Sequence, residues 1–215
     1  MASRKEAAVA DTETDEARRN REHRDKMRRH KAARDRMMET KTEERGLVVV
    51  LTGNGKGKST SAMGMALRCV GHGMKVGIVQ FIKGGMESAE RRVLAGFPDL
   101  VVFRVMGEGF TWETQDRARD MAAARAAFEA AKEMVSDPSF KMVILDELNV
   151  VLRYDYLPLG EVLDMLAGKP RDTHVVITGR HAPAELVECA DLVTDMAPVK
   201  HPFRSGVKAQ PGVEY

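Results

Sequence analysis

The sequence has few of the features that mark secreted, disulfide-stabilised or membrane proteins. Its two cysteines, Cys69 and Cys189, lie far apart in apolar contexts, which favours buried thiols in a reducing compartment over a disulfide or a metal site. There is no run of about 18 apolar residues, so we expect no membrane span. The first residues, MASRKEAAVADTETDE, have no apolar segment typical of a secretory signal. We therefore expect a cytoplasmic protein.

Aromatic residues and an excess of one charge are also scarce. Aromatics make up 5% of the chain, and the formal net charge is only +2. A charge so close to zero argues against a strongly electrostatic partner such as bulk DNA. Hydrophobic residues make up 43% of the 215 residues, which is enough for one domain with a substantial core plus extensions.

The first 45 residues differ in composition from the rest. They contain no Leu, Ile, Phe, Trp or Tyr, and they carry 14 Lys/Arg and 11 Asp/Glu, so this segment cannot bury enough apolar surface to fold alone. We expect disorder over 1–17 and a charged helical arm over 18–45 that gains order only by docking. Its basic stretch from Arg18 to Arg36 also allows an anion-facing arm or a nucleic-acid contact, although no aromatic residue interleaves to stack on a base.

From Gly46 onward, β-branched runs alternate with helical patterns, which predicts one α/β domain over 46–215. The expected strands are 46–52, 75–84, 100–107, 141–149, 173–180 and 192–200. The expected helices are 59–73, 88–97, 114–137 with a Thr-led cap, 158–170 with Pro near its start and Gly near its end, and 182–190. This order predicts a mostly parallel central sheet of about six strands covered by helices on both faces. The last residues, 201–215, are broken by Gly and Pro and are expected to pack as an irregular tail.

The stretch LTGNGKGKST, residues 51–60, resembles a phosphate-binding loop that is one residue short. The usual pattern has four residues between its first Gly and the Gly-Lys-Ser/Thr, whereas only three separate Gly53 from Gly57. The loop lies between an expected strand and an expected helix, where backbone N–H groups and the helix N-terminus attract phosphate. Lys58 would meet the outer phosphates and Ser59 would offer a hydroxyl to Mg²⁺. The alternative is a plain tight turn.

A pair of carboxylates, Asp146 and Glu147, follows the apolar run MVIL at the end of the fourth expected strand. Ligands of open α/β sheets bind at this end of the strands. In nucleotide hydrolases the first carboxylate holds Mg²⁺ and a following Glu can activate water. The alternative is an ordinary acidic pair at a strand end. Together with the loop, the pair predicts a Mg²⁺–nucleoside triphosphate site.

Several motifs together resemble the ATP:corrinoid adenosyltransferases of cobalamin biosynthesis and salvage. They are TGNGKGKST, GHGMKVGIVQFIKG, GFTWETQD, ILDELNVVLRYDYL, VVITGRHAPAELVECADLVTDM and KHPFRSGVKAQPGVEY. The resemblance runs from about Arg18 to Tyr215 and implies a P-loop NTPase-like (RecA-like) fold. It also implies that Co(I) of a reduced corrinoid attacks C5′ of ATP and that the whole triphosphate leaves. The family is thought to seat its phosphates in the reverse direction along the loop, and a tightened loop is consistent with that seating.

The resemblance assigns roles to residues of this chain. It implies ATP binding by Gly53, Asn54, Gly55, Lys56, Gly57, Lys58, Ser59, Thr60 and Arg68, and metal binding by Ser59, Asp146 and Glu147. Lys58 would act in catalysis by stabilising the leaving triphosphate. Arg68 could instead pair with a surface acid.

The resemblance places Phe110 and Trp112 in the corrinoid pocket, where they would displace the lower axial ligand of cobalt and ease its reduction. Without it, a hydrophobic plug over the sheet is the simpler interpretation of the two aromatics. The resemblance also implies ATP and Mg²⁺ (or Mn²⁺), a reduced flavoprotein as electron donor, and a homodimer in which the arm covers a corrinoid site. The alternatives are a P-loop ATPase or small-molecule kinase, and a nucleotide-dependent switch or nucleic-acid-binding module.

Overall fold

The computed structural model describes residues 14–82, 88–106 and 116–214. The chain divides into two units, one ending at Glu44 and one running from Arg45 to Tyr215. Phe110 and Trp112 lie outside the described residues. Within the described residues, no helix is long and apolar enough to cross a membrane.

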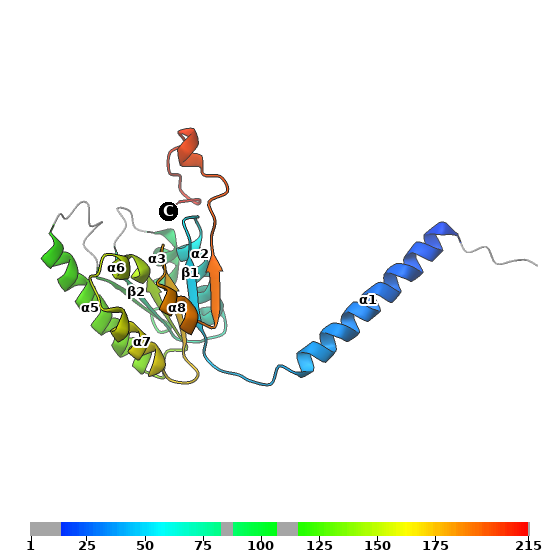
Figure 1. Cartoon of the computed structure of the whole chain (residues 1–215), viewed down its shortest axis with the longest axis horizontal. Coiled ribbons are helices and arrows are strands. Elements are labelled where there is room, and N and C mark those ends of the chain that lie inside the picture. Colours follow the sequence, from blue (N-terminus) through cyan, green and yellow to red (C-terminus); the bar gives the residue numbers. More distant parts are fainter. Residues whose placement is uncertain (1–13, 83–87, 107–115, 215) are drawn as a thin grey trace, which may run out of the picture. The chain divides into compact units, whose positions relative to one another are not determined.

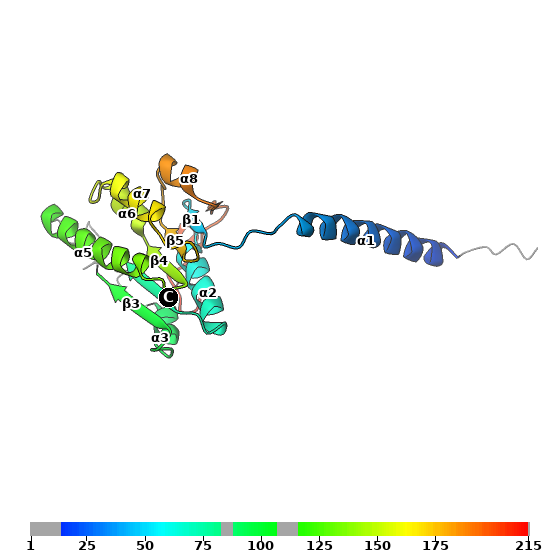
Figure 2. The same cartoon turned by 90° about the horizontal axis from the view of Figure 1, so that it is seen from below.

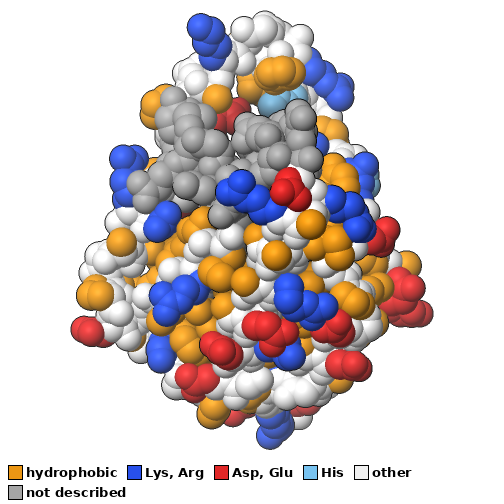
Figure 3. All heavy atoms as spheres, turned by 90° about the vertical axis from the view of Figure 1, so that its left-hand side faces the viewer, with side chains coloured by type: hydrophobic (Ala, Val, Ile, Leu, Met, Phe, Trp, Pro, Cys, Tyr) orange, Lys and Arg blue, Asp and Glu red, His pale blue; other side chains and the backbone are white. Residues whose placement is uncertain are grey.

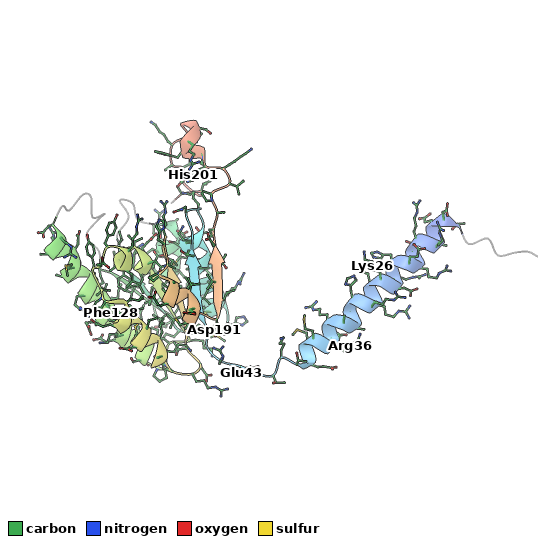
Figure 4. All side chains as sticks on the ribbon, in the orientation of Figure 1. Lys26, Arg36, Glu43, Phe128, Asp191 and His201 are labelled. Carbon is green, nitrogen blue, oxygen red and sulfur yellow. The ribbon has the colours of Figure 1, made fainter. Side chains whose placement is uncertain are left out.

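The N-terminal unit contains one helix, α1 (Asp15–Glu39). It begins three residues before the predicted boundary because the Thr14 hydroxyl accepts a hydrogen bond from the Ala17 N–H at 3.2 Å, which caps the first turn. It ends at Glu39 rather than continuing to residue 45. No residue of this helix is buried, and side chains such as Lys26 and Arg36 extend from it into solvent (Figure 4). That the arm needs a docking partner stays a prediction.

The second unit is built on a six-stranded sheet whose strands are all parallel (Figure 1). The strands are β1 (Val48–Thr52), β2 (Val76–Gln80), β3 (Val101–Val105), β4 (Met142–Asp146), β5 (His174–Thr178) and β6 (Leu192–Asp195). Their order in the sheet is β3-β2-β4-β5-β1-β6. All residues of β1 and β4 are buried, as expected of apolar runs covered on both faces. The predicted α/β fold with a parallel sheet is therefore confirmed.

Helices cover both faces of the sheet. They are α2 (Lys58–Gly71), α3 (Ala89–Leu94), α5 (Arg117–Ser136), α6 (Leu148–Arg153), α7 (Leu159–Ala167) and α8 (Ala184–Cys189). One core cluster joins the sheet to α5, α6, α7 and α8, with Phe128 of α5 fully buried (Figure 4). A second cluster joins the other face to α2 and α3. Figure 2 shows the helices on the two sides of the strands.

Two predictions about helices were wrong. α5 begins at Arg117, and its cap is Asp116, whose carboxylate accepts from the Arg119 N–H at 3.1 Å, so the predicted Thr-led start is not used. α6 was not predicted, and the strand expected over 141–149 ends at Asp146. The chain turns there since Glu147 adopts a left-handed conformation, with φ 62°.

After β6 the chain continues beyond the carboxyl edge of the sheet as an irregular tail with one short 3-10 turn, Pro202–Ser205 (Figure 1). Charged side chains of both signs are interspersed over the face shown in Figure 3, with apolar side chains between them. The carboxyl ends of β1, β5 and β4 lie side by side in the sheet. The candidate loop and the candidate acidic pair follow β1 and β4, so the fold brings them to one edge.

Candidate nucleotide site

The glycines of the loop after β1 are needed for both conformation and space. Gly53 and Gly57 have φ of 92° and 108°, in the left-handed region that favours glycine. A Cβ added at Gly55 would lie 2.5 Å from the Met196 carbonyl oxygen. The Gly55 N–H donates to that same oxygen at 2.5 Å. The loop therefore packs directly on the backbone after β6, and Gly55 donates its N–H to this contact.

Lys58 opens α2 and turns its side chain back over the loop. Its Nζ donates to the carbonyl oxygens of Gly53 at 2.8 Å and Gly55 at 2.6 Å, and the side chain is buried. Burial lowers the pKa of Lys58, while the charge of Glu147 opposes that effect. An ammonium has three donors, so one N–H of Lys58 stays available for a phosphate oxygen.

The N-terminus of α2 is suited to an anion. Its cap is Gly57, which has no side chain to bond the first amides, and no acidic residue lies in the first turn. The initial N–H groups of a helix have no partner within the helix and carry partial positive charge. Ser59 and Thr60 lie in this first turn, as predicted, with Ser59 half-buried and Thr60 exposed.

The other predicted loop residues differ in exposure and in their contacts. Asn54 and Lys56 are exposed, and the Lys56 ammonium forms an ion pair with the carboxylate of Glu214 in the tail.

Arg68 lies in the last turn of α2 and is exposed. It is ten residues beyond Lys58, or about 15 Å along the helix axis. The structure does not bring Arg68 to the loop, so it can contact only a part of the nucleotide that extends along α2.

The first carboxylate, Asp146, is held at the end of β4 by two neighbours. It is 2% exposed. The Thr178 hydroxyl, at the end of β5, donates to one carboxylate oxygen at 2.7 Å. The Gln80 amide, at the end of β2, donates to the other at 3.2 Å. A buried carboxylate with such partners is fixed in orientation.

The second carboxylate, Glu147, is held through its backbone. Its N–H donates to the Thr178 hydroxyl at 2.9 Å, so one hydroxyl positions both members of the pair. Burial and, to a smaller extent, the charge of Asp146 raise the pKa of Glu147 to about 7, against the opposing charges of Lys58 and Arg180. The electrostatic influence of Lys58 on Glu147 agrees with their position at the same sheet edge.

The donor set fits Mg²⁺ better than a softer metal. Its atoms are the two carboxylates and the Ser59 hydroxyl, which are the hard oxygen ligands that Mg²⁺ prefers. Within the described residues there is no group of three or more His, Cys, Asp or Glu that could hold a metal ion. Mg²⁺ commonly binds one or two carboxylates together with substrate phosphates and waters rather than a cage made only of protein ligands. The residues present are therefore consistent with a metal held jointly with a bound nucleotide.

Sequence patterns did not identify Thr178 or Gln80 as site residues. Each is a single polar residue at the end of an apolar strand, and its partner Asp146 is 32 or 66 residues away in the chain. Only the positions of these residues at strand ends could have identified them from the sequence. Both residues end parallel strands that neighbour β4, and such ends share one sheet edge.

Comparisons with known proteins identify the family of the chain. Residues 44–215 match the model of the ATP:corrinoid adenosyltransferase BtuR/CobO/CobP family. The chain belongs to this family. A corrinoid adenosyltransferase of Sinorhizobium sp is 54% identical over 208 residues, which cover 96% of this chain and 95% of that protein. One from Pseudomonas aeruginosa is 49% identical, covering 92% and 97%, and one from Escherichia coli strain K12 is 52% identical, covering 80% and 87%.

Membership of the adenosyltransferase family extends over the whole α/β unit, because the matched residues begin at position 44 and end at 215. The α1 arm lies outside the family model. The Sinorhizobium relative nevertheless covers all but 4% of this chain, so much of the arm has a counterpart in that protein.

Proposed function

We propose that the protein transfers the 5′-deoxyadenosyl group of ATP to the Co(I) centre of a reduced corrinoid and releases triphosphate. The observation that carries this proposal is the meeting, at one sheet edge, of the Gly53–Ser59 loop with Asp146 and Glu147 in a chain that belongs to this family. The electron pair of Co(I) forms the cobalt–carbon bond at C5′. The C5′–O bond breaks, and its electron pair leaves on the triphosphate.

The loop and helix α2 would stabilise the leaving group. Charge develops on the α-phosphate oxygen as the C5′–O bond breaks, so fixed donors aimed at the phosphates lower the barrier. Lys58 and the open amides at the start of α2 supply such donors. The compact loop, with the Gly55 N–H already bonded to Met196, supports a seating of the phosphates that differs from the ordinary one and turns C5′ toward the corrinoid.

Asp146, Glu147 and Ser59 would hold Mg²⁺ against the triphosphate. When bound, the ion neutralises part of the charge on the leaving group. Hydrogen bonds from Thr178 and Gln80 keep Asp146 oriented for this task. Mn²⁺ has the same preference for oxygen ligands.

The corrinoid side of the site would involve Phe110 and Trp112, which would keep the lower axial ligand away from cobalt. A reduced flavoprotein would supply the electron, in the cytoplasm. We also propose a homodimer, which is supported by apolar side chains exposed on β6 and the tail. Leu192 is 48%, Val199 90% and Phe203 79% exposed, and apolar side chains exposed in this way favour association.

The test is anaerobic incubation of the protein with ATP, Mg²⁺ and chemically reduced cobalamin, followed by optical spectra. We expect conversion to the spectrum of an alkylated corrinoid, dependent on both protein and ATP. Steady ADP production without spectral conversion would instead favour a P-loop ATPase or kinase. Nucleic-acid binding that falls steeply with salt would favour a binding module.

A further inference from the structure

We infer that Arg180, in the turn after β5, is a further binding residue for the triphosphate part of ATP. This inference rests on the proposed function and adds a residue to the same site. Arg180 belongs to the motif TGRHAP, and neither the loop nor the acidic pair accounts for it.

The strand order places this turn between the two halves of the site. β5 lies between β1, which leads into the loop, and β4, which ends at Asp146. Thr178, the last residue of β5, is in register with Leu51 of β1 and bonds to Asp146 on the other side. Arg180 follows two residues later, so its backbone leaves the sheet between the phosphate loop and the carboxylates.

The turn is fixed to both neighbours by hydrogen bonds. The Gly179 N–H donates to the Leu51 carbonyl at 3.2 Å, and the Gly179 carbonyl accepts from the buried Asn149 amide at 3.0 Å. The Ala182 N–H donates to the Thr52 hydroxyl at 3.1 Å. These bonds hold the backbone on each side of Arg180, so little conformational freedom remains to be lost when a ligand binds.

The turn also has unusual backbone geometry. Gly179 has φ 129° and His181 has φ 58°. A left-handed conformation at a residue other than glycine is uncommon and costs energy, and such positions are concentrated at ligand sites. A Cβ at Gly179 would lie 2.8 Å from the Asn149 Cβ, so the turn is pressed onto α6. The positive φ angles lie on both sides of the arginine, and the unfavourable one is that of His181.

The charge balance of the site calls for another cation. Of the two loop lysines, Lys56 is paired with Glu214, and Lys58 forms no ion pair with a carboxylate among the residues that the structure describes. Asp146 and Glu147 lie across from the loop. A leaving triphosphate carries several negative charges, so Lys58 alone, facing two carboxylates, leaves a deficit of positive charge even when a divalent ion is bound.

The Arg180 side chain is available to meet that deficit. It is exposed and forms no hydrogen bond or ion pair with any other residue that the structure describes. Its charge lowers the pKa of both Lys58 and Glu147, which agrees with a position near both. A guanidinium presents paired donors that match phosphate oxygens and stays charged at all working pH values.

The experiment compares Arg180→Gln with Arg171→Gln, an exposed arginine before the opposite end of the same strand. Isothermal titration calorimetry measures Mg²⁺-ATP, inorganic triphosphate and adenosine binding to each full-length variant and to the unmodified protein. We expect Arg180→Gln to weaken ATP and triphosphate by a similar factor, about tenfold to a hundredfold for a charge-assisted contact, and to leave adenosine unchanged. Arg180→Lys should recover part of the affinity, and Arg171→Gln should change nothing.

Triphosphate affinity that is unchanged in Arg180→Gln would overturn the inference, as would an equal loss in Arg171→Gln. Loss of adenosine affinity alone would also overturn it, because the residue would then contact the nucleoside. The proposed function is judged separately by corrinoid conversion in the unmodified protein. Conversion without any effect of Arg180→Gln on triphosphate affinity refutes only the role of Arg180. Triphosphate binding that depends on Arg180 without conversion refutes only the proposed reaction.

Discussion

Glu147 gives the protein a specific dependence of stability on pH. Burial, and then the charge of Asp146, raise the pKa of Glu147 from 4.5 to about 7 in the folded protein. The folded state therefore holds its proton over a pH range in which the unfolded state has lost it. Stability must fall as pH rises through this window, from about 4.5 to about 7, and it must level off above the window.

The size of the effect follows from the shift. Each pKa unit corresponds to about 1.4 kcal/mol, so the free energy of unfolding falls by about 3.5 kcal/mol over the whole window, of which about 2.5 kcal/mol falls between pH 5 and pH 8. The substitution Glu147→Gln removes the charge and keeps the side-chain shape. We expect Glu147→Gln to be more stable than the unmodified protein at pH 8, and the advantage to shrink toward pH 5.

Urea unfolding curves at pH 5 to 8, recorded in EDTA so that no metal occupies the site, measure this difference. Glu161→Gln is the matched control. Its ion pair with Arg125 lowers the pKa of Glu161. The ion pair therefore stabilises the folded protein above the unfolded pKa of Glu161, and this stabilisation is lost as pH falls. Glu161→Gln should therefore be the less stable protein at pH 8. Parallel stability curves for Glu147→Gln and the unmodified protein would refute the reasoning.

Other predictions concern residues around the same site. Lys58→Ala should lower turnover at least about a hundredfold with any corrinoid, since the leaving triphosphate loses its main cation; residual turnover near normal in a steady-state assay would contradict this role. Thr178→Val should cost about 1–3 kcal/mol in urea unfolding, because two buried hydrogen bonds are lost, and Thr178→Ser should recover most of it. Gly55→Ala should lower the melting temperature and the ATP affinity together, because its Cβ would meet the Met196 carbonyl; unchanged values would show that the loop is not packed there. Trp112→Ala should slow turnover far more when reduction starts from Co(II) on the enzyme than when Co(I) is supplied, and equal losses would exclude the axial-ligand role.

The strands were predictable because each one carries a local signal. β1 and β4 are short β-branched or apolar runs bounded by polar residues and glycine, and such runs fit a sheet covered on both faces. The start of α5 was mispredicted because Thr and Asp are both good caps, and the sequence alone does not rank Asp116 against a threonine two residues earlier. The missed α6 depends on the left-handed conformation of Glu147, which no neighbouring glycine signals.

The candidate site also has one part that local sequence motifs indicate and another part that they do not. The loop and the acidic pair were predictable, because each is a contiguous motif whose function depends on local geometry. Thr178 and Gln80 were not, because they contact Asp146 from strand ends 32 and 66 residues away in the chain. The ion pair of Lys56 with Glu214, 158 residues away, had no local signal at all. Such contacts are determined by strand order, which a single sequence does not state.

The most direct test of the central claim is the fate of the phosphates. Phosphorus NMR of an anaerobic reaction with ATP, Mg²⁺ and reduced corrinoid can distinguish triphosphate from ADP and inorganic phosphate. If C5′ is the electrophile, intact triphosphate should accumulate in a one-to-one ratio with the new cobalt–carbon bond, and only when Co(I) is present. Release of ADP or inorganic phosphate in place of triphosphate, at a rate independent of the corrinoid, would contradict the account.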